Sequence, residues 1–477
     1  MSAYEAVIGL EIHAQLRTAS KIFCGCSTAF GAPPNTHVCP VCLGLPGSLP
    51  VLNRAAVEYA IRAALALGCR INETSIFARK NYFYPDLPKG YQISQYERPL
   101  ASEGVLSFAK PGREPVRITR VHLEEDAGKS LHEGFPDSLR KTHVDFNRSG
   151  TPLIEIVTEP DLRSAGDAAE FFTELRAILV WLGVNDGNME EGSLRCDANV
   201  SVRPAGTSAL GTKAEVKNLN SFRFVERALE YEIERQVELV ESGRPVIQET
   251  RLWDAAAGET VSMRSKEEAH DYRYFPEPDL PPVLVDAAAV ASIARDMPEL
   301  PQARRQRFVA ALALPDYDAA ILTTSRAVAD FFEATVAAGA PAKAASNWMM
   351  GELTRALNDS GKAITDSPVS PERLAGLLAL VDQGRISGAM AKTVFEKMFA
   401  SGQSASDIVA VEGLAQITDD AQIAERITAV LAANDDAVAQ YRAGKSAALG
   451  FLVGQVMKAT GGKANPKRVN ELLKQML

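Results

Sequence analysis

The chain begins with a segment in which apolar and polar residues alternate, Ile8-Gly-Leu-Glu-Ile-His-Ala-Gln-Leu16. The even positions are all apolar, whereas the odd positions include Glu11, His13 and Gln15. Because successive side chains of a β-strand point to opposite faces, a period of two predicts a strand with one apolar and one polar face. We therefore expect these three polar side chains to share one surface of a sheet.

The same alternation recurs in four later segments, residues 118–124, 153–157, 194–202 and 213–217. Their polar positions hold Arg120, His122, Glu124, Glu155, Arg195, Asp197, Asn199, Ser201, Lys213, Glu215 and Lys217. These segments predict an antiparallel sheet with one apolar face and one face crowded with ionisable groups. An ordinary half-solvated sheet also alternates, but its wet face would favour Thr, Lys and Glu. Carboxylates with histidine instead suit Mg²⁺ or Mn²⁺ and the phosphates that these ions carry.

The composition is that of a globular protein with more than one domain. The chain has 477 residues, of which 46% are hydrophobic and 23% are charged, so it can bury a core. No run approaches the roughly 18 consecutive apolar residues of a membrane helix. The N-terminus has no basic segment followed by an apolar one. We therefore expect a cytoplasmic protein without membrane contact.

Changes in composition along the chain predict three parts. The first part alternates like strands, carries helical stretches at residues 53–68, 164–183 and 221–243, and ends near a segment with four prolines, residues 275–282. An Ala/Leu-rich helical stretch follows, and residues 401–407 look like a second linker. We predict an α+β fold with an antiparallel-sheet cradle domain and packing helices (1–285), an all-α helical domain (286–405) and a small α-helical tail (406–477).

Four of the six cysteines form two close pairs, Cys24-Gly-Cys26 and, after twelve residues, Cys39-Pro-Val-Cys42. In a reducing compartment this spacing favours a tetrahedral Zn²⁺ site over disulfides. Four thiolate ligands leave no open coordination position, so the expected role is structural. A loop of free thiols and a redox-active pair are the alternatives, and the latter lacks the expected βαβ context.

Aromatic and basic residues concentrate in residues 79–96. The segment holds Tyr82, Phe83, Tyr84, Tyr91 and Tyr96, interleaved with Arg79, Lys80 and Lys89. Aromatic faces stack on bases and cations bind phosphates, so the pattern suits a nucleic acid or nucleotide. Taken alone, the pattern slightly favours a Tyr/Pro-rich loop folded on itself.

The C-terminal end is basic although the whole chain has a net charge of −9. Residues 442–477 carry seven basic residues and one acidic residue, Glu471. A basic end on an acidic body suits a polyanionic partner, and a solvated lysine-bearing surface is the alternative.

Several long motifs resemble the B subunits of the aspartyl/glutamyl-tRNA amidotransferases. One of them is His122-Leu-Glu-Glu-Asp-Ala-Gly-Lys129. The others are residues 8–16, 80–96, 145–155 and 263–266, and residues 450–458 and 464–470 are similar to the YqeY-like end of that family. The resemblance covers essentially the whole chain.

The resemblance implies a carbon–nitrogen ligase that uses glutamine as its amido donor. In that family, the B-type chain activates the side-chain carboxylate of mischarged Glu-tRNA(Gln) or Asp-tRNA(Asn) with ATP, and ammonia then displaces phosphate. The implied partners are the amidase subunit, the small subunit of the heterotrimer, the mischarged tRNA and the non-discriminating aminoacyl-tRNA synthetase. The implied cofactors are ATP, Mg²⁺ and a structural Zn²⁺.

The resemblance also suggests roles for individual residues. The expected Mg²⁺ ligands are Glu11, His13, Glu124 and Glu155, with Glu125 as an alternative ligand or a catalytic residue. Lys80 and Lys89 are expected to meet phosphate or the activated intermediate. The pocket for the cofactor and the tRNA acceptor end is expected to include Tyr82, Tyr91, Lys129, Asn147 and Arg148, and the basic tail to bind the tRNA body.

A non-catalytic tRNA- or RNA-binding scaffold is the competing hypothesis. It accounts for the cysteine pairs, the aromatic segment and the basic tail. The density of carboxylates on one sheet face argues against it, because they would repel RNA unless a metal ion intervened.

Overall fold

The computed structural model describes residues 3–108, 112–265, 272–414, 417 and 419–477. The chain forms two compact units, Met1–Leu300 and Pro301–Leu477, and each is described by itself. Within the described part of the chain, no helix combines the length and the apolarity that a bilayer crossing requires.

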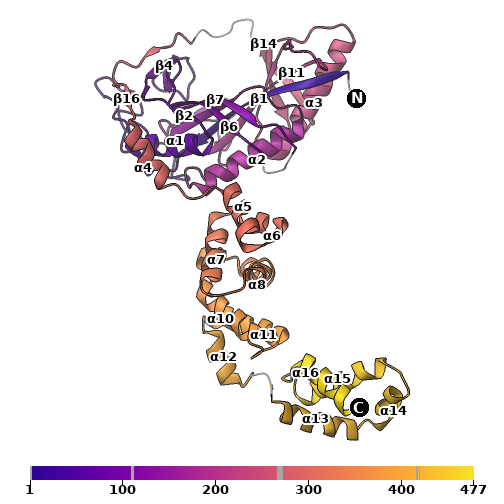
Figure 1. The fold of residues 1–477 in the computed structure, drawn as a ribbon. Coiled ribbons are helices and arrows are strands. Elements are labelled where there is room, and N and C mark those ends of the chain that lie inside the picture. The colour runs from indigo at the N-terminus through magenta and orange to yellow at the C-terminus, as the bar shows by residue number, and fades with distance from the viewer. Residues whose placement is uncertain (1–2, 109–111, 266–271, 415–416, 418) are drawn as a thin grey trace. The chain divides into compact units, whose positions relative to one another are not determined.

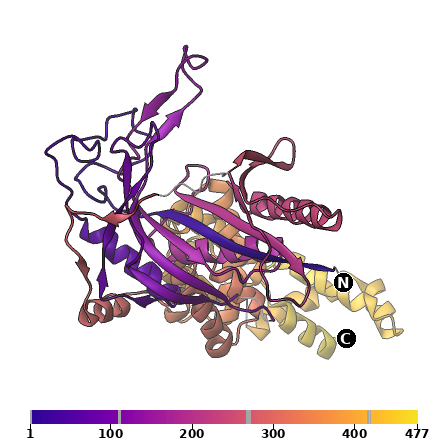
Figure 2. The same cartoon turned by 90° about the horizontal axis from the view of Figure 1, so that it is seen from above.

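A nine-stranded sheet organises the first unit (Figure 1). Its strands, in spatial order, are β14 (Glu259–Ser265), β13 (Glu249–Asp254), β12 (Ala214–Lys217), β11 (Leu194–Pro204), β1 (Tyr4–Gln15), β10 (Pro152–Thr158), β7 (Val116–Glu125), β6 (Ala101–Leu106) and β2 (Arg70–Ile71). Neighbouring strands are antiparallel except β12 and β13. Figure 2 shows the indigo strand β1 lying between strands from later in the sequence.

Three small sheets complete the strand content of the described residues. They are β15 (Phe275–Pro276) with β4 (Phe77–Asn81) and β5 (Tyr91–Gln95), β16 (Val283–Leu284) with β3 (Thr74–Ser75), and β8 (Lys129–Leu131) with β9 (His143–Asp145). The proline-rich segment therefore begins as an edge strand, where a missing backbone N–H costs no ladder hydrogen bond.

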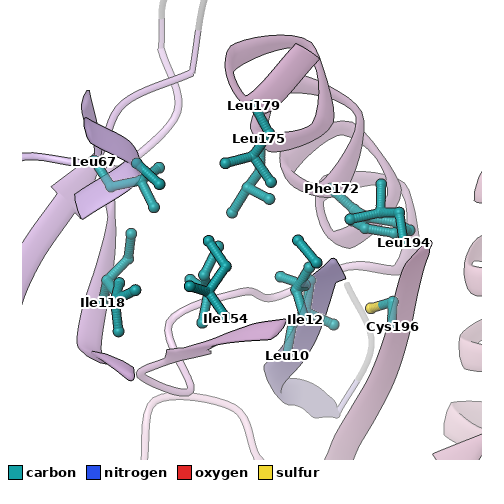
Figure 3. Close-up of a cluster of buried hydrophobic side chains, with 14 of the residues drawn as sticks. Leu10, Ile12, Leu67, Ile118, Ile154, Phe172, Leu175, Leu179, Leu194 and Cys196 are labelled. Carbon is teal, nitrogen blue, oxygen red and sulfur yellow. The ribbon is translucent and has the colours of Figure 1, made fainter. Parts of the chain in front are cut away.

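Helices cover the apolar face of the large sheet. They are α1 (Arg54–Ala66), α2 (Ala165–Trp181) and α3 (Phe222–Glu241), with α4 (Ala287–Arg295) contacting α1. Asn53, Ser164 and Ser221 cap the first three helices through side-chain oxygens that accept backbone N–H groups. In Figure 3, Leu175 and Leu179 of α2 face the inward side chains of the strands.

The second unit is helical. Its elements are α5 (Pro301–Leu312), α6 (Asp316–Leu322), α7 (Arg326–Ala337), α8 (Ala342–Trp348), a π-helical turn η1 (Met349–Leu353), α9 (Thr354–Ser360), a 3₁₀ turn η2 (Ile364–Asp366), α10 (Pro371–Asp382), α11 (Gly388–Ser401), α12 (Ala405–Glu412), α13 (Asp420–Ala432), α14 (Asp435–Arg442), α15 (Ala447–Ala459) and α16 (Pro466–Met476). The last four helices enclose an apolar cluster that includes Ile427, Leu452 and Leu473. Asn465 caps α16 and Pro466 occupies its first turn, which suits a residue without a backbone N–H.

The structure confirms the α+β fold class, with an antiparallel-sheet cradle, its packing helices and an α-helical C-terminal part. The helices expected in residues 53–68, 164–183 and 221–243 form. The division into parts 1–285, 286–405 and 406–477 stays a prediction.

The packing of α2 predicts a large loss of stability when Leu175 is truncated. Leu175 is fully buried, so Leu175→Ala should lower the free energy of unfolding of the first unit by about 2–5 kcal/mol. Urea unfolding followed by the fluorescence of Trp181 and Trp253, both buried in this unit, measures the change. The matched control is Val180→Ala on the same helix, where the side chain is 39% exposed and the cost should stay below about 1 kcal/mol. Equal losses in both variants would contradict this account of the core.

Candidate active site

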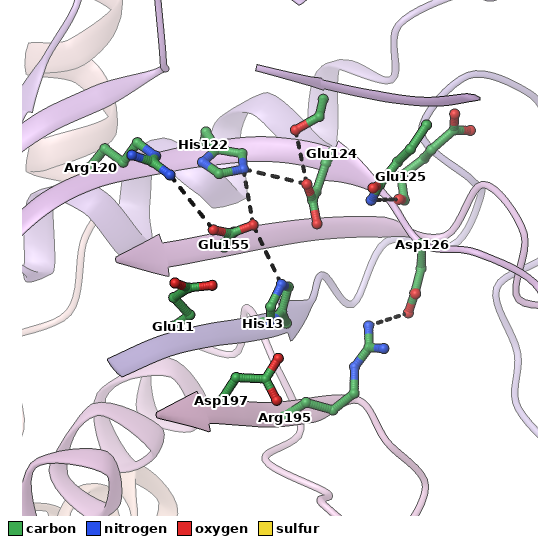
Figure 4. A network of polar contacts seen from close by, with 12 residues as sticks. Glu11, His13, Arg120, His122, Glu124, Glu125, Asp126, Glu155, Arg195 and Asp197 are labelled. Carbon is green, nitrogen blue, oxygen red and sulfur yellow. Dashed lines mark hydrogen bonds and ion pairs between the residues drawn. The ribbon is translucent and has the colours of Figure 1, made fainter. Parts of the chain in front are cut away.

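The polar face of the sheet gathers ionisable residues into one row across four strands. His13 of β1 lies opposite Glu155 of β10 on one side and opposite Arg195 of β11 on the other. Glu155 in turn lies opposite His122 of β7. Residues that are directly opposite on neighbouring strands share a face. The register therefore places His122, Glu155, His13 and Arg195 side by side, as Figure 4 shows.

Three of these strands bring together a potential metal site. The Nε2 atom of His122 lies 3.4 Å from both Glu124 Oε2 and Glu155 Oε2, and the Nε2 atom of His13 also lies 3.4 Å from Glu155 Oε2. One ligand atom each from His13, Glu124 and Glu155 lies within 4.8 Å of the other two. Ser94 of β5 fixes Glu124 by donating a 2.9 Å hydrogen bond to it. Two carboxylates and an imidazole at this spacing fit a divalent cation with positions left for water or phosphate.

Electrostatics keep the carboxylates of this cluster ionised. Burial disfavours the charged form of Glu155, but the neighbouring imidazoles of His122 and His13 outweigh it and hold the pKa of Glu155 well below its usual value. Burial likewise disfavours the His122 imidazolium, yet Glu155 and Glu124 raise the pKa of His122 to about 9. Ionised carboxylates are the form that binds Mg²⁺ or Mn²⁺.

The cluster forms the floor of a cavity of about 660 Å³. Of the predicted site residues, Glu11, His13, Lys80, Tyr82, Glu124, Arg148 and Glu155 line this cavity. Glu11 lies outside the close group of three ligands, and its Oε1 accepts a 2.9 Å hydrogen bond from Asn199. The Nζ atom of Lys80 lies 4.9 Å from the ring centre of Tyr272 and 5.9 Å from that of Tyr82. An ammonium group and tyrosine rings therefore line the same cavity as the carboxylates.

The structure does not bring Lys89, Tyr91 and Glu125 into this cavity. Glu125 follows Glu124 on β7 and therefore points to the other face. It pairs with Lys89 and accepts a 2.8 Å hydrogen bond from the backbone N–H of Ile93. Lys89, Tyr91 and Glu125 line a separate cavity of about 60 Å³ beside Cys24 and Cys42.

Lys129 and Asn147 line a third cavity, of about 540 Å³, which shares Arg148 with the large one. Asn147 donates a 2.8 Å hydrogen bond to the carbonyl of Pro33 and accepts a 2.8 Å hydrogen bond from the backbone N–H of His37. The side chain of Arg148 donates to the carbonyls of Ala127 and Gly128. Both residues therefore have structural partners in addition to any ligand.

The four clustered cysteines converge as their spacing predicts. One Sγ atom from each of Cys24, Cys26, Cys39 and Cys42 lies within 4.8 Å of the others. Four sulfurs bound to Zn²⁺ at ~2.3 Å lie roughly 3.8 Å apart, so the donor set fits a tetrahedral ion. A hydrogen bond from Cys24 lowers the pKa of Cys42 to about 4, although burial opposes the shift. A thiolate is the form that binds zinc.

The cysteine loop is tied to the segment that leads into β10. The buried ammonium of Lys21 donates to the carbonyls of His37 and Phe146 at 2.7 and 3.3 Å. The backbone N–H of Ile22 donates to Gly150, and Ser149 donates to the Cys42 carbonyl. The loop thus supports the strand that carries Glu155 without contributing to the large cavity.

Sequence reasoning did not identify the residues that reach the site through pairing between distant segments. Ser94 contacts Glu124 because β5 lies beside β7. Tyr274, which stacks on Tyr96 with ring centres 4.3 Å apart, comes from just before β15. Both tyrosines line the large cavity. The repeated Tyr-rich and Pro-rich stretches at residues 82–88 and 274–281 were the available signal. Of the predicted motif at residues 263–266, residue 266 lies outside the described residues.

Comparison with known proteins places this geometry in a family. Residues 6–291 match the model of the GatB/GatE catalytic domain, and residues 330–477 match that of the GatB domain. The chain belongs to the GatB/GatE family. It is 57% identical over 475 residues to a protein of Geobacter sulfurreducens, covering 99% of both chains.

Two further relatives of this GatB/GatE protein are similarly close. A protein of Anaeromyxobacter sp. is 58% identical over 482 residues, covering 100% of this chain and 99% of the relative. One from Moorella thermoacetica is 58% identical over 475 residues, covering 99% of this chain and 100% of the relative. All three relatives are named as the B subunit of an aspartyl/glutamyl-tRNA(Asn/Gln) amidotransferase. The resemblance read from the sequence motifs is thus confirmed.

The cysteine cluster predicts about one zinc ion per chain. Cys39→Ser should remove most of the zinc and destabilise the loop that supports β10, because metal binding and folding are coupled in such sites. Elemental analysis of the purified GatB/GatE protein gives the zinc content, and thermal unfolding reports the stability. Cys69→Ala is the control, since Cys69 is buried and does not belong to the cluster, so this variant should leave the zinc content unchanged. Wild-type protein without zinc would refute the assignment.

Proposed function

We propose that this chain activates the side-chain carboxylate of mischarged Glu-tRNA(Gln) or Asp-tRNA(Asn) with ATP and converts it to the amide with ammonia derived from glutamine. The relatives are named as B subunits of an amidotransferase, which supports a tRNA-dependent carbon–nitrogen ligase. The observation that carries the proposal is the close group of His13, Glu124 and Glu155 on the floor of a large cavity that Lys80 also lines.

The cavity has the groups that such a reaction needs. A carboxylate is a poor electrophile, so it must first gain a leaving group, and phosphorylation supplies one. In this proposal His13, Glu124 and Glu155 hold Mg²⁺, with Glu11 as a further predicted ligand. The ion supplies neutralising charge where the two anionic substrates meet. The ammonium group of Lys80 contributes a second positive charge toward the phosphates.

The tyrosines around the cavity suit the acceptor end of a tRNA. Tyr82, Tyr272 and Tyr274 line the cavity, and aromatic faces stack on bases. Lys129, Asn147 and Arg148 are kept as predicted contacts of the cofactor or acceptor end from the adjoining cavity. Lys89, Glu125 and Tyr91 line the small cavity on the other sheet face, and their contact with phosphate or the acceptor end stays a prediction.

The proposed reaction requires partners. A separate amidase subunit is proposed to deliver the ammonia. The relatives' naming as B subunits fits an assembly that also holds a small third subunit. The synthetase that makes the mischarged tRNA is a further proposed partner. Because aminoacyl-tRNA is the substrate, we place the protein in the cytoplasm.

The C-terminal helices offer a surface for the tRNA body. Lys445, Lys458, Lys467 and Lys474 are exposed, whereas Arg468 pairs with Asp420 and Glu471. Exposed lysines that are able to reach phosphates displace counterions from a nucleic acid. We propose that these four lysines bind the tRNA backbone.

Loss of one carboxylate ligand tests the metal site. In the assembled amidotransferase, Glu155→Gln should reduce ATP-dependent formation of Gln-tRNA or Asn-tRNA by about 100-fold or more, because a neutral amide cannot hold the cation. Glutaminase activity of the same complex should remain. The control is Glu159→Gln, just beyond β10, where the carboxylate accepts a hydrogen bond from Thr119 and does not line the cavity. Normal amide formation by the Glu155 variant would refute the proposal.

Neutralising the exposed lysines tests whether the C-terminal tail binds tRNA. Replacement of Lys445, Lys458, Lys467 and Lys474 by Gln should raise the KM for tRNA and leave kcat nearly unchanged. The slope of the logarithm of the tRNA association constant against the logarithm of salt concentration should become shallower by roughly 0.9 for each lost phosphate contact. Steady-state kinetics at several salt concentrations measure both effects. Lys362→Gln, another exposed lysine, is the control, and an unchanged KM in the fourfold variant would exclude the tail as a tRNA-binding surface.

A further inference from the structure

Six basic side chains of the described residues line the large cavity, and three of them have close polar partners. They are Lys80, Arg120, Arg148, Arg195, Lys213 and Lys217. Arg195 pairs with Asp126 at 2.8 Å, and Lys217 pairs with Asp197 and Glu215 at 2.9 and 3.0 Å. Arg148 donates two hydrogen bonds to backbone carbonyls, and Lys213 is exposed to water. Within the part of the chain that the structure describes, Arg120 and Lys80 therefore remain as half-buried cations without a close polar partner.

Arg120 is unusual because an arginine fork normally finds strong acceptors. Among the described residues its one ion pair is with Glu155, with Nη2 4.0 Å from Oε1, which is beyond hydrogen-bond distance. Its Nε atom is shielded from solvent and has no hydrogen-bond partner among those residues. A buried donor without an acceptor costs about 1–3 kcal/mol, more for a charged group. Such an arrangement is explained if a ligand supplies the acceptors.

The position of Arg120 indicates which kind of ligand would supply these acceptors. Arg120, His122 and Glu124 share one face of β7, so the guanidinium lies beside the proposed metal ligands and over the cavity (Figure 4). Guanidinium groups bind the oxygens of phosphate through parallel hydrogen bonds. A guanidinium can also bind a planar carboxylate. Here, however, the anion must bind next to the negative charges of Glu124 and Glu155. A phosphate that carries a metal ion fits this position better than a bare carboxylate.

We propose that Arg120 is a catalytic residue of phosphoryl transfer, binding the non-bridging oxygens of the phosphoryl group as it moves from ATP to the carboxylate of the aminoacyl-tRNA. In this step the bond between the γ-phosphorus and the bridging oxygen breaks, and ADP leaves with the electron pair. A new bond forms between that phosphorus and a carboxylate oxygen, and no proton transfer is required. Arg120 donates hydrogen bonds throughout and stabilises the charge on the transferred group. The inference rests on the proposed function.

Positional isotope exchange in ATP isolates this step. The assembled complex is incubated with oxygen-labelled ATP, Mg²⁺ and mischarged tRNA without any ammonia source, so that phosphoryl transfer reverses and scrambles the label. Arg120→Gln should lower the exchange rate by about 100-fold or more. Arg120→Lys should lower it by about tenfold, because an ammonium lacks the planar fork. Glutaminase activity and the KM for tRNA should stay within about threefold of wild type.

The matched control is Arg117→Gln. Arg117 lies on the same strand, is exposed, pairs with Asp161 at 2.7 Å and does not line the cavity. This variant loses the same charge and should exchange label at the wild-type rate. An equal loss in both variants would overturn the proposal, because it would reflect net charge or strand stability.

Binding of Mn²⁺ separates a catalytic role from a structural one. If Arg120 merely orients Glu155, Arg120→Gln and Arg120→Lys should weaken Mn²⁺ binding, measured by electron paramagnetic resonance without nucleotide. The proposal requires an unchanged or tighter Mn²⁺ affinity, since removing a nearby cation does not harm a cation site. Weakened Mn²⁺ binding, or exchange within about threefold of wild type in Arg120→Gln, overturns it. Absence of exchange in wild-type complex would instead refute the proposed function itself.

Discussion

The register of β1 between β10 and β11 is the constraint on which the rest of the first unit depends. Because side chains alternate along a strand, the pairing of His13 with Glu155 and Arg195 fixes both faces together. A slip by one residue would move Ile12 into the cavity and His13 under the helices. The fully buried Ile8, Leu10 and Ile12 make that slip costly. Hydrophobic packing against α2 thus holds the ionisable side chains in position on the opposite face.

Burying that many charges is possible because they occur in compensating groups. Isolated charges in a protein interior cost several kcal/mol each, whereas paired and hydrogen-bonded charges cost much less. His122 contacts Glu124 and Glu155, and Asp126 accepts from Gln15 and Arg195. Arg120 departs from this pattern. Its one ion pair among the described residues, with Glu155, is 4.0 Å long, whereas Arg195 on the same face pairs with Asp126 at 2.8 Å.

Local patterns predicted the sheet, its helices and the carboxylates that share its polar face, because a period of two depends only on neighbouring residues. Glu124 and Glu125 show how far this reasoning reaches, since alternation alone puts them on opposite faces. It could not show which cavity Lys89 enters, because that depends on the pairing of β4 with β5 and on the contact of β5 with β7. Ser94 and Tyr274 were missed for the same reason. The cysteine cluster was accessible because metal-ligand spacing is itself a local signal.

Two consecutive residues of β7, Glu124 and Glu125, point to opposite faces of the sheet and meet different partners. On one face Glu124 meets His122 in the large cavity, and on the other Glu125 pairs with Lys89 beside the cysteine loop. A sheet is only one residue thick, so groups on its two faces are near in sequence yet screened from one another by the backbone. Two adjacent carboxylates can therefore hold different partners. One short acidic motif thus contributes both to the large cavity and to a separate buried ion pair.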